Sequence, residues 1–138
     1  MNPRQRQWEA LPQTRKDAGW LWIQLHSEIV DQCETLLNPD YFGSPLPPLP
    51  AGAVLSYAQP WHERMMLALR CKGGDYMMNV IFDPDLLSVR YAVDCDPFPH
   101  DLLVVRRRGE SFLQTYDRTL LGAEEAARRI VLTLTARA

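Results

Sequence analysis

Apolar residues recur at helical spacing between residues 17 and 38. They stand at the i, i+3, i+4 and i+7 intervals of an amphipathic helix, namely at Ala18, Trp22, Leu25, Ile29, Cys33 and Leu36. Asp17 is a suitable N-cap, because its carboxylate can accept hydrogen bonds from the free amide groups of the first turn. Asn38-Pro39 ends the pattern, because proline disfavours the helical conformation in the residue before it.

The remaining positions of this helix are polar and are expected to face solvent. Those that fall off the apolar stripe are Gln24, Glu28, Asp31 and Glu34. His26 lies near the edge of the stripe, one turn from Trp22 and Ile29, so we expect it at the boundary of the core.

Two segments flank the helix without a clear apolar period. Residues 1–16 are polar and contain two prolines, so we expect a flexible arm, ordered at most in part, that Trp8 and Leu11 hold against the body. Residues 39–52 form a connector in which five of the twelve residues from 39 to 50 are proline, which favours an extended, polyproline-like backbone. Its PxxP spacing is also found in ligands of aromatic grooves, but a stiff connector is the simpler interpretation.

Alternation with a period of two follows and predicts about six strands. The segments are Ala53–Ala58, Arg64–Lys72, Asp75–Phe82, Ser88–Cys95, Leu102–Arg107 and Ser111–Tyr116. Turn residues separate most of them: Lys72-Gly73-Gly74-Asp75, Asp83-Pro84-Asp85 and Arg108-Gly109-Glu110. Sequential strands joined by tight turns favour an antiparallel meander.

A second amphipathic pattern runs from Leu121-Gly122 to Ala136. Its first turn is acidic at Glu124 and Glu125, and each acid stands four residues before an arginine, which stabilises a helix. The chain is therefore expected to be one α+β domain over residues 1–138. It has an N-terminal helix, an antiparallel meander of about five to six strands, and a C-terminal helix packed on the sheet.

The second face of the predicted sheet is less polar than a solvated face should be. Apolar residues on it are Met66, Ala68, Met77, Ile81 and Ala92. Two explanations stay open: the sheet curls around a helix, or this face meets a partner.

Composition excludes several classes of function. The 138 residues include 15 basic and 17 acidic side chains, with a net charge of −2, which disfavours a broad nucleic-acid-binding surface. No apolar run is long enough for a membrane span, and three cysteines without CxxC spacing predict neither a disulfide framework nor a zinc site. We expect a cytoplasmic protein without a cofactor.

Three local groups could carry chemistry. The loop 94–101 combines carboxylates, Cys95 and His100, but it matches no metal-ligand spacing, and an ordinary acidic loop is the favoured interpretation. His62 stands beside Glu63, although neighbours in a strand point to opposite faces. Arg106-Arg107-Arg108 can hold an anion or an acidic partner, or simply end a strand in solvent.

The sequence thus favours a non-enzymatic protein-binding module of the adaptor, chaperone-like or immunity/inhibitor type, self-associating as a homodimer or binding a protein partner through a sheet face. Residues expected to contribute to binding are Met66, Met77, Ile81, Trp61, His62, Arg106, Arg107 and Arg108. The alternative is a small-molecule-binding or hydrolase-like domain with an apolar pocket inside a curled sheet. Its expected lining is Trp61, Tyr76, Tyr91 and Phe112, with His62 or His100 at the mouth.

Overall fold

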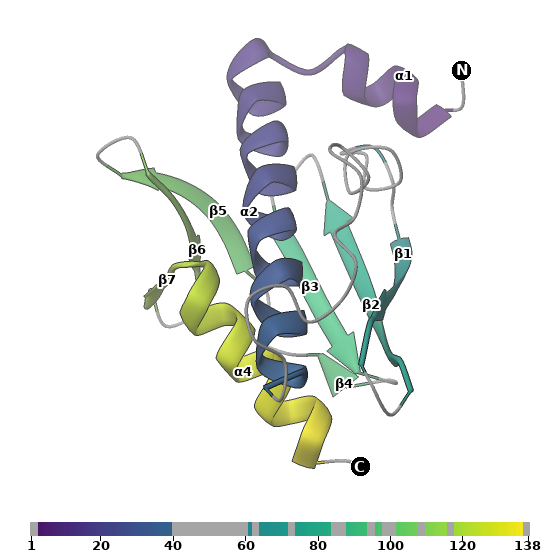
Figure 1. The fold of residues 1–138 in the computed structure, drawn as a ribbon. Helices are drawn as coiled ribbons and strands as arrows, with labels where there is room; N and C mark the ends of the chain where they lie inside the picture. Colours follow the sequence, from purple (N-terminus) through teal and green to yellow (C-terminus); the bar gives the residue numbers. More distant parts are fainter. Residues whose placement is uncertain are drawn as a thin grey trace.

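The computed structural model shows an α+β fold and describes residues 3–39, 61, 64–71, 74–83, 88–93, 96–97, 102–107, 110–115 and 118–136. The helices are α1 (Pro3–Glu9), α2 (Gln13–Leu37) and α4 (Ala123–Ala136). The strands are β1 (Arg64–Leu69), β2 (Tyr76–Asp83), β3 (Ser88–Val93), β4 (Asp96–Pro97), β5 (Leu102–Arg107), β6 (Glu110–Gln114) and β7 (Leu120–Leu121). Figure 1 shows their arrangement.

All the described strand pairs are antiparallel, in the order β1-β2-β3-β5-β6-β7 with β4 beside β3. The strands form two small groups, β1–β4 and β5–β7. The link between the groups is short, because β3 and β5 share only the pairs Ser88–Leu103 and Val89–Leu102. This topology confirms the predicted meander.

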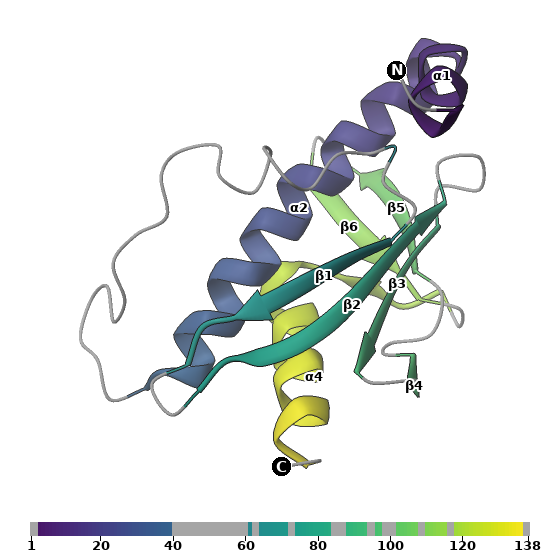
Figure 2. The same ribbon diagram turned by 90° about the vertical axis from the view of Figure 1, so that its right-hand side faces the viewer.

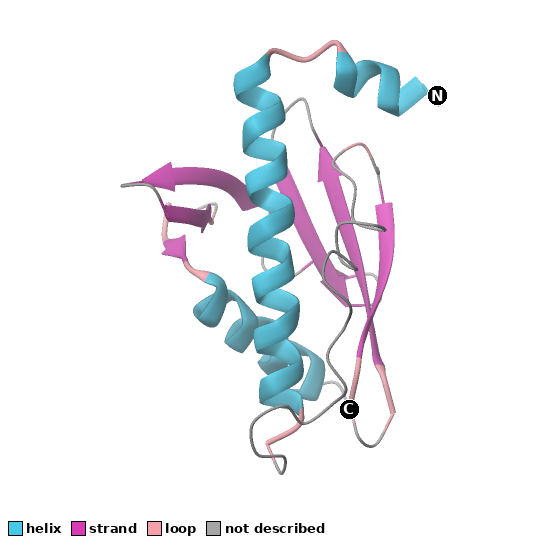
Figure 3. Ribbon diagram, turned by 45° about the horizontal axis from the view of Figure 1, so that its top comes forward, coloured by secondary structure: helices cyan, strands magenta, loops and turns pink. Residues whose placement is uncertain are grey.

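Helix α2 lies between the two strand groups, as Figures 1 and 3 show. It contacts β1 on one side and β5 and β6 on the other. The strands therefore bend around a helix, which was one of the two arrangements that the sequence left open. Helix α4 packs chiefly against α2, with smaller contacts to β3 and β7, instead of lying mainly on the sheet as expected.

The core lies between α2, α4 and the inner faces of the strands. Its largest fully buried side chains include Trp22, Tyr91, Phe82, Ile23 and Ile29. Burial of this apolar surface is the dominant stabilising contribution. No helix in the described part of the chain is long and apolar enough to cross a membrane.

Helix α2 differs from the prediction at its start and in its buried face. It begins at Gln13, four residues before the expected cap, and Asp17 instead accepts a hydrogen bond from the Gln13 side chain at 2.9 Å. Leu36 is exposed although it fits the apolar period. Conversely, His26 and Glu34 are buried, and each meets a polar partner: Tyr91 on β3 for His26, and Arg70 just after β1 for Glu34.

Residues 3–16 are more regular than the flexible arm expected for residues 1–16. Residues Pro3–Glu9 form α1, and its Trp8 is buried. Leu11 packs on the core, so both predicted anchors contact the body. The indole of Trp8 supplies enough apolar surface to hold a helix of two turns in place.

Local turn signals predicted the hairpins correctly. The pairs β1–β2, β2–β3 and β5–β6 all form, and the amide of Gly74 donates to the Cys71 carbonyl at 3.1 Å in the first turn. Gly74 has a φ of +127°, which glycine adopts without strain. The short strands β4 and β7 were not predicted, and the expected strand Ala53–Ala58 and connector 39–52 lie outside the described residues, apart from Pro39.

Candidate functional site

The face of β1–β3 turned away from α2 is the candidate interaction surface. Figure 2 looks onto this strand group, with both long helices behind it. Burial alternates strictly along β1, so Arg64, Met66 and Ala68 point outward while Met65, Leu67 and Leu69 enter the core. We call the outward side of these three strands the outer face.

Cross-strand pairing arranges the outer face in rows. One row consists of Arg64, Ile81 and Arg90, because Ile81 pairs with Arg64 on β1 and with Arg90 on β3. The next row is Met66, Asn79 and Ala92, and Ala68 with Met77 forms a third. The outer face therefore carries arginines at one end and methionines towards the other.

The large apolar side chains that are exposed on this face are the two methionines. Met66 is 58% exposed and Met77 is 51% exposed. Ala68 is also exposed, Ile81 is half-buried, and Asn79 and Ala92 are buried. Flexible, polarisable methionine side chains adapt to partner surfaces of different shapes. The β1–β2 part of the outer face is thus the open apolar part.

The structure does not bring all the predicted binding residues together. Arg106 and Arg107 lie at the end of β5, where their backbones pair with Ser111 and Glu110 in the other strand group. His62 and Arg108 lie outside the described residues. Met66, Met77 and Ile81 do share one face, as the alternation predicted.

Trp61 belongs to an aromatic cluster that the sequence analysis missed. Its ring centroid lies 6.4 Å from that of Trp8 and 6.3 Å from that of Trp20, and the Trp8 and Trp20 centroids are also 6.3 Å apart. The three indoles come from α1, α2 and the chain just before β1. Edge-to-face contacts of this kind fix the position of α1 against the body.

A buried polar pair occupies the centre of the core. His26 of α2 and Tyr91 of β3 are fully buried, and 3.0 Å separates His26 Nδ1 from the Tyr91 hydroxyl. Trp22 stacks between His26 and Phe82, with centroid separations of 5.3 and 4.5 Å. Nothing in the described part of the chain hydrogen-bonds to His26 Nε2.

Burial decides the ionisation of this pair. Desolvation lowers the pKa of His26 to about 4, so the imidazole is neutral at physiological pH. Desolvation also raises the pKa of Tyr91, and Cys33 adds to this shift. A neutral, enclosed imidazole bonded to a phenol cannot reach a substrate, so its role here is to join α2 to β3.

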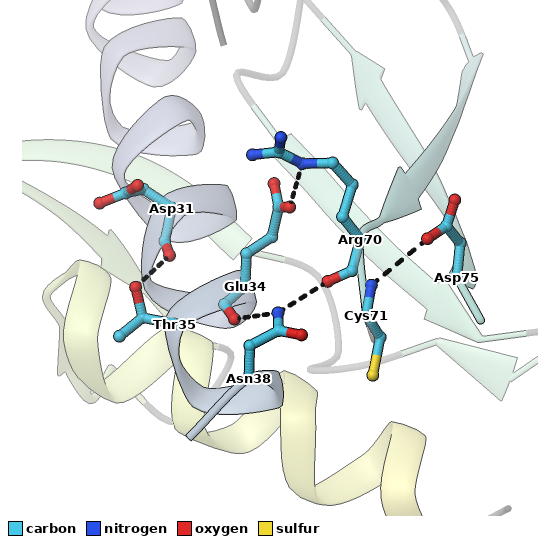
Figure 4. A network of polar contacts seen from close by, with 7 residues as sticks. All are labelled: Asp31, Glu34, Thr35, Asn38, Arg70, Cys71 and Asp75. Carbon is cyan, nitrogen blue, oxygen red and sulfur yellow. Dashed lines mark hydrogen bonds and ion pairs between the residues drawn. The ribbon is translucent and has the colours of Figure 1, made fainter. Parts of the chain in front are cut away.

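A second polar network joins the end of α2 to the end of β1 (Figure 4). The guanidinium of Arg70 donates to the Glu34 carboxylate at 2.5 Å, and Glu34 is only 8% exposed against 32% for Arg70. The side-chain amide of Asn38 donates to the carbonyls of Glu34 and Arg70 at 2.6 and 3.0 Å. This network accounts for the burial of an acid expected in solvent.

The described cysteines are held as structural groups. Desolvation, with a smaller contribution from Glu34, raises the pKa of Cys33 to about 12, and its thiol lies 3.8 Å from the Ala127 carbonyl. Cys71 is half-buried, with its thiol 3.6 Å from the Leu37 carbonyl. The raised pKa makes the Cys33 thiol a poor nucleophile.

Among the described residues, no three His, Cys, Asp or Glu side chains converge in a way that could hold a metal ion. Most of the loop 94–101 lies outside these residues, although Asp96 and Pro97 form β4. The metal hypothesis for that loop remains a sequence-based hypothesis.

No protein-family model, curated protein or solved structure matches the chain. The outer face is therefore the part of the chain whose geometry points most directly to a function.

Proposed function

We propose that this protein is a non-enzymatic protein-binding module whose docking surface is the β1–β2 part of the outer face. The observation that carries the proposal is the exposure of Met66 and Met77 on paired strands beside Ala68. A contiguous apolar patch on a protein surface often marks an interaction site, whereas single exposed apolar residues are common and need no explanation. The sequence favours a homodimer, so a second copy is the first occupant to test.

The strand register supports the proposal independently of exposure. Ala68 pairs directly with Met77, and Met66 lies one row away, so the three side chains adjoin on one surface. Neighbouring side chains on one face of a sheet lie about 5 to 7 Å apart. Leu132 is also exposed, but it lies on α4 and not on this face.

No comparable observation supports the alternative function, an apolar ligand pocket inside a curled sheet. Trp61 contacts Trp8 and Trp20, whereas Tyr91 contacts His26 in the centre of the core. These two expected lining residues thus belong to different clusters, and α2 occupies the space between the strand groups.

The test compares a double variant, Met66→Gln with Met77→Gln, against the matched control Leu132→Gln, which makes the same kind of change on α4 at a residue that is 68% exposed. Light scattering coupled to size exclusion measures self-association over a range of concentrations. Affinity capture with purified bait then compares the proteins retained by each variant.

We expect the double variant to lose an association that the wild type and the Leu132→Gln control retain. If self-association and the set of captured proteins are the same for all three, the outer face is not a docking surface and the proposal is wrong. Circular dichroism confirms that each variant is folded before either measurement.

A further inference from the structure

We propose that α1 is a detachable strap, and that the site formed by Trp20 and Trp61 beneath it receives the α1 of a second copy of this chain. The strap is held by Trp8, whose ring contacts both of these indoles. The inference goes beyond the proposed function, because its residues are not those of the outer face.

Helix α1 is anchored by a single buried side chain. Among its residues, Pro3–Glu9, only Trp8 is buried. Figure 1 shows α1 at the end of the molecule where α2 begins, and in the described part of the chain no other helix or strand packs along it. Isolated helices of this length are not stable in water, so α1 keeps its place only while the Trp8 indole is docked.

The site under Trp8 is built from two further indoles. The ring centroids of Trp20 and Trp61 are 6.3 Å apart with an interplanar angle of 88°, and the Trp8 centroid lies 6.3 and 6.4 Å from them. Trp20 is exposed even with α1 docked. Buried indoles are frequent anchors of protein interfaces, and these three rings make the same contacts whichever chain supplies Trp8.

The polar groups of α1 add little to its docking. Arg4 lies one turn before Trp8, and nothing in the described part of the chain hydrogen-bonds to its buried Nε. Removing an unpaired guanidinium N–H from water costs free energy, which offsets part of the gain from burying the indole. The ion pair of Glu9 with Lys16, at 3.7 Å, involves a Glu9 side chain that is 55% exposed, so its contribution is small.

The joint between α1 and α2 can act as a hinge. The chain bends at Pro12, which has an extended ψ of 149° between the two helices. Because proline disfavours the helical conformation at Leu11, α1 and α2 do not merge into one continuous helix. Rotation about the backbone of residues 10–12 therefore moves α1 while α2 stays in the core.

A second copy is the occupant that fits this site. The structure shows α1 seated on Trp20 and Trp61, so the α1 of another copy meets the same rings with the same geometry. Exchange of an identical element forms a dimer without requiring any new contact. Within one chain the short connection raises the effective concentration of α1 at its own site to the millimolar range, so exchanged dimers become more abundant as the protein concentration rises.

The first experiment uses a labelled peptide of residues 1–12 as the probe and the full chain as the target. Fluorescence anisotropy measures its Kd for the wild type and for Trp8→Ala, whose own α1 lacks the anchor. We expect the peptide to bind Trp8→Ala and to bind the wild type about tenfold or more weakly, because the wild-type α1 competes for the site. Trp8→Ala in the peptide should abolish binding, whereas Gln7→Ala, at an exposed position of α1, should leave the Kd unchanged.

The second experiment follows the exchange between full chains by light scattering over a range of protein concentrations. We expect a dimer fraction that rises with concentration, persists in the double variant Met66→Gln with Met77→Gln, and is lost in Trp8→Ala. A dimer formed through the outer face has the opposite response to these two changes, so the strap and the proposed function are tested separately.

Three results would overturn the inference. A peptide that does not bind Trp8→Ala, or that binds both chains equally, shows that the site does not exchange its own α1 for that of another molecule. A wild type that stays monomeric at every concentration shows that a second copy is the wrong occupant. A Trp8→Ala chain that circular dichroism finds unfolded shows that α1 is part of the core and not a strap.

Discussion

Met65 and Met66 are neighbours in β1, yet Met65 is 8% exposed and Met66 is 58% exposed. Across the hairpin, Met78 is 1% exposed and Met77 is 51% exposed. The same residue type therefore stands on both faces of one pair of strands, and only the inner copies are covered by α2 and the core. The comparison shows that side-chain chemistry alone does not reveal which face of a sheet is the core.

The inner face is explained by the fold, whereas the outer face is not. Met65, Leu67, Met78 and Val80 join the apolar core that includes Trp22 and Ile29. Removing these side chains from water stabilises the folded state. No such gain keeps Met66 and Met77 in place, which is why the outer face is the place to look for function.

The largest effect is expected at the inner face. Met78→Ala should reduce the free energy of unfolding by about 3 to 4 kcal/mol, because it removes buried methylene groups and leaves a cavity. Urea denaturation followed by circular dichroism measures the loss. A reduction below about 1 kcal/mol would mean that the core can collapse around the gap or that Met78 is not enclosed.

Lowering the pH should destabilise the folded protein, because His26 in the same core becomes protonated when the chain unfolds. Its pKa is about 4 in the folded protein against 6.5 for the free side chain, so the unfolded chain binds the proton more readily between these values. The contribution of neutral His26 to the free energy of unfolding is fully present above pH 6.5. It decreases as the pH falls towards 4, by roughly 3 kcal/mol in total.

Urea titrations at pH 7.5, 6, 5 and 4 measure this dependence, with His26→Gln as the control that cannot titrate in this range. Tyr91 is the ionisable group that faces the imidazole directly, with Cys33 near Tyr91, and neither loses its proton at these pH values. An unchanged pH dependence in the control would show that other groups, such as carboxylates, cause the acid sensitivity.

Sequence periodicity predicted the hairpins and both faces of β1 because the causes are local. Gly74 permits its turn within a few residues of Cys71, and the alternation of Met66 with Leu67 needs no distant contact. By contrast, the burial of His26 depends on Tyr91, 65 residues away, and that of Glu34 on Arg70, 36 residues away. Helical spacing cannot disclose partners at such separations.

The candidate site, like the fold, was predicted only where its causes are local. Met66, Met77 and Ile81 were placed on one face by alternation alone, whereas the positions of Arg64 and Arg90 beside Ile81 depend on the strand register. Register follows from turn geometry and from the buried face together. The arrangement of charges on the outer face therefore became known only from the pairing of β1, β2 and β3.

A smaller effect is expected where a charge is half enclosed. Arg70→Ala leaves the Glu34 carboxylate, which is 8% exposed, without its guanidinium partner. The cost should be about 2 kcal/mol, between the values for exposed and fully buried pairs. Urea denaturation measures it, and Arg128→Ala is the matched control, since its pair with Glu124 is exposed on both sides and should contribute below about 0.5 kcal/mol. Equal costs for the two variants would contradict the distinction.

The smallest effect is expected at Met77, and it completes the comparison with Met78. Met77→Ala makes the same change one position along β2, on a side chain that is half in solvent. It should alter the free energy of unfolding by less than about 0.5 kcal/mol, because few enclosed contacts are lost. Urea denaturation of Met77→Ala and Met78→Ala under the same conditions compares the two losses in free energy of unfolding directly. A cost near that of Met78→Ala would mean that the outer face is covered within the monomer, and the case for a docking surface would then fail.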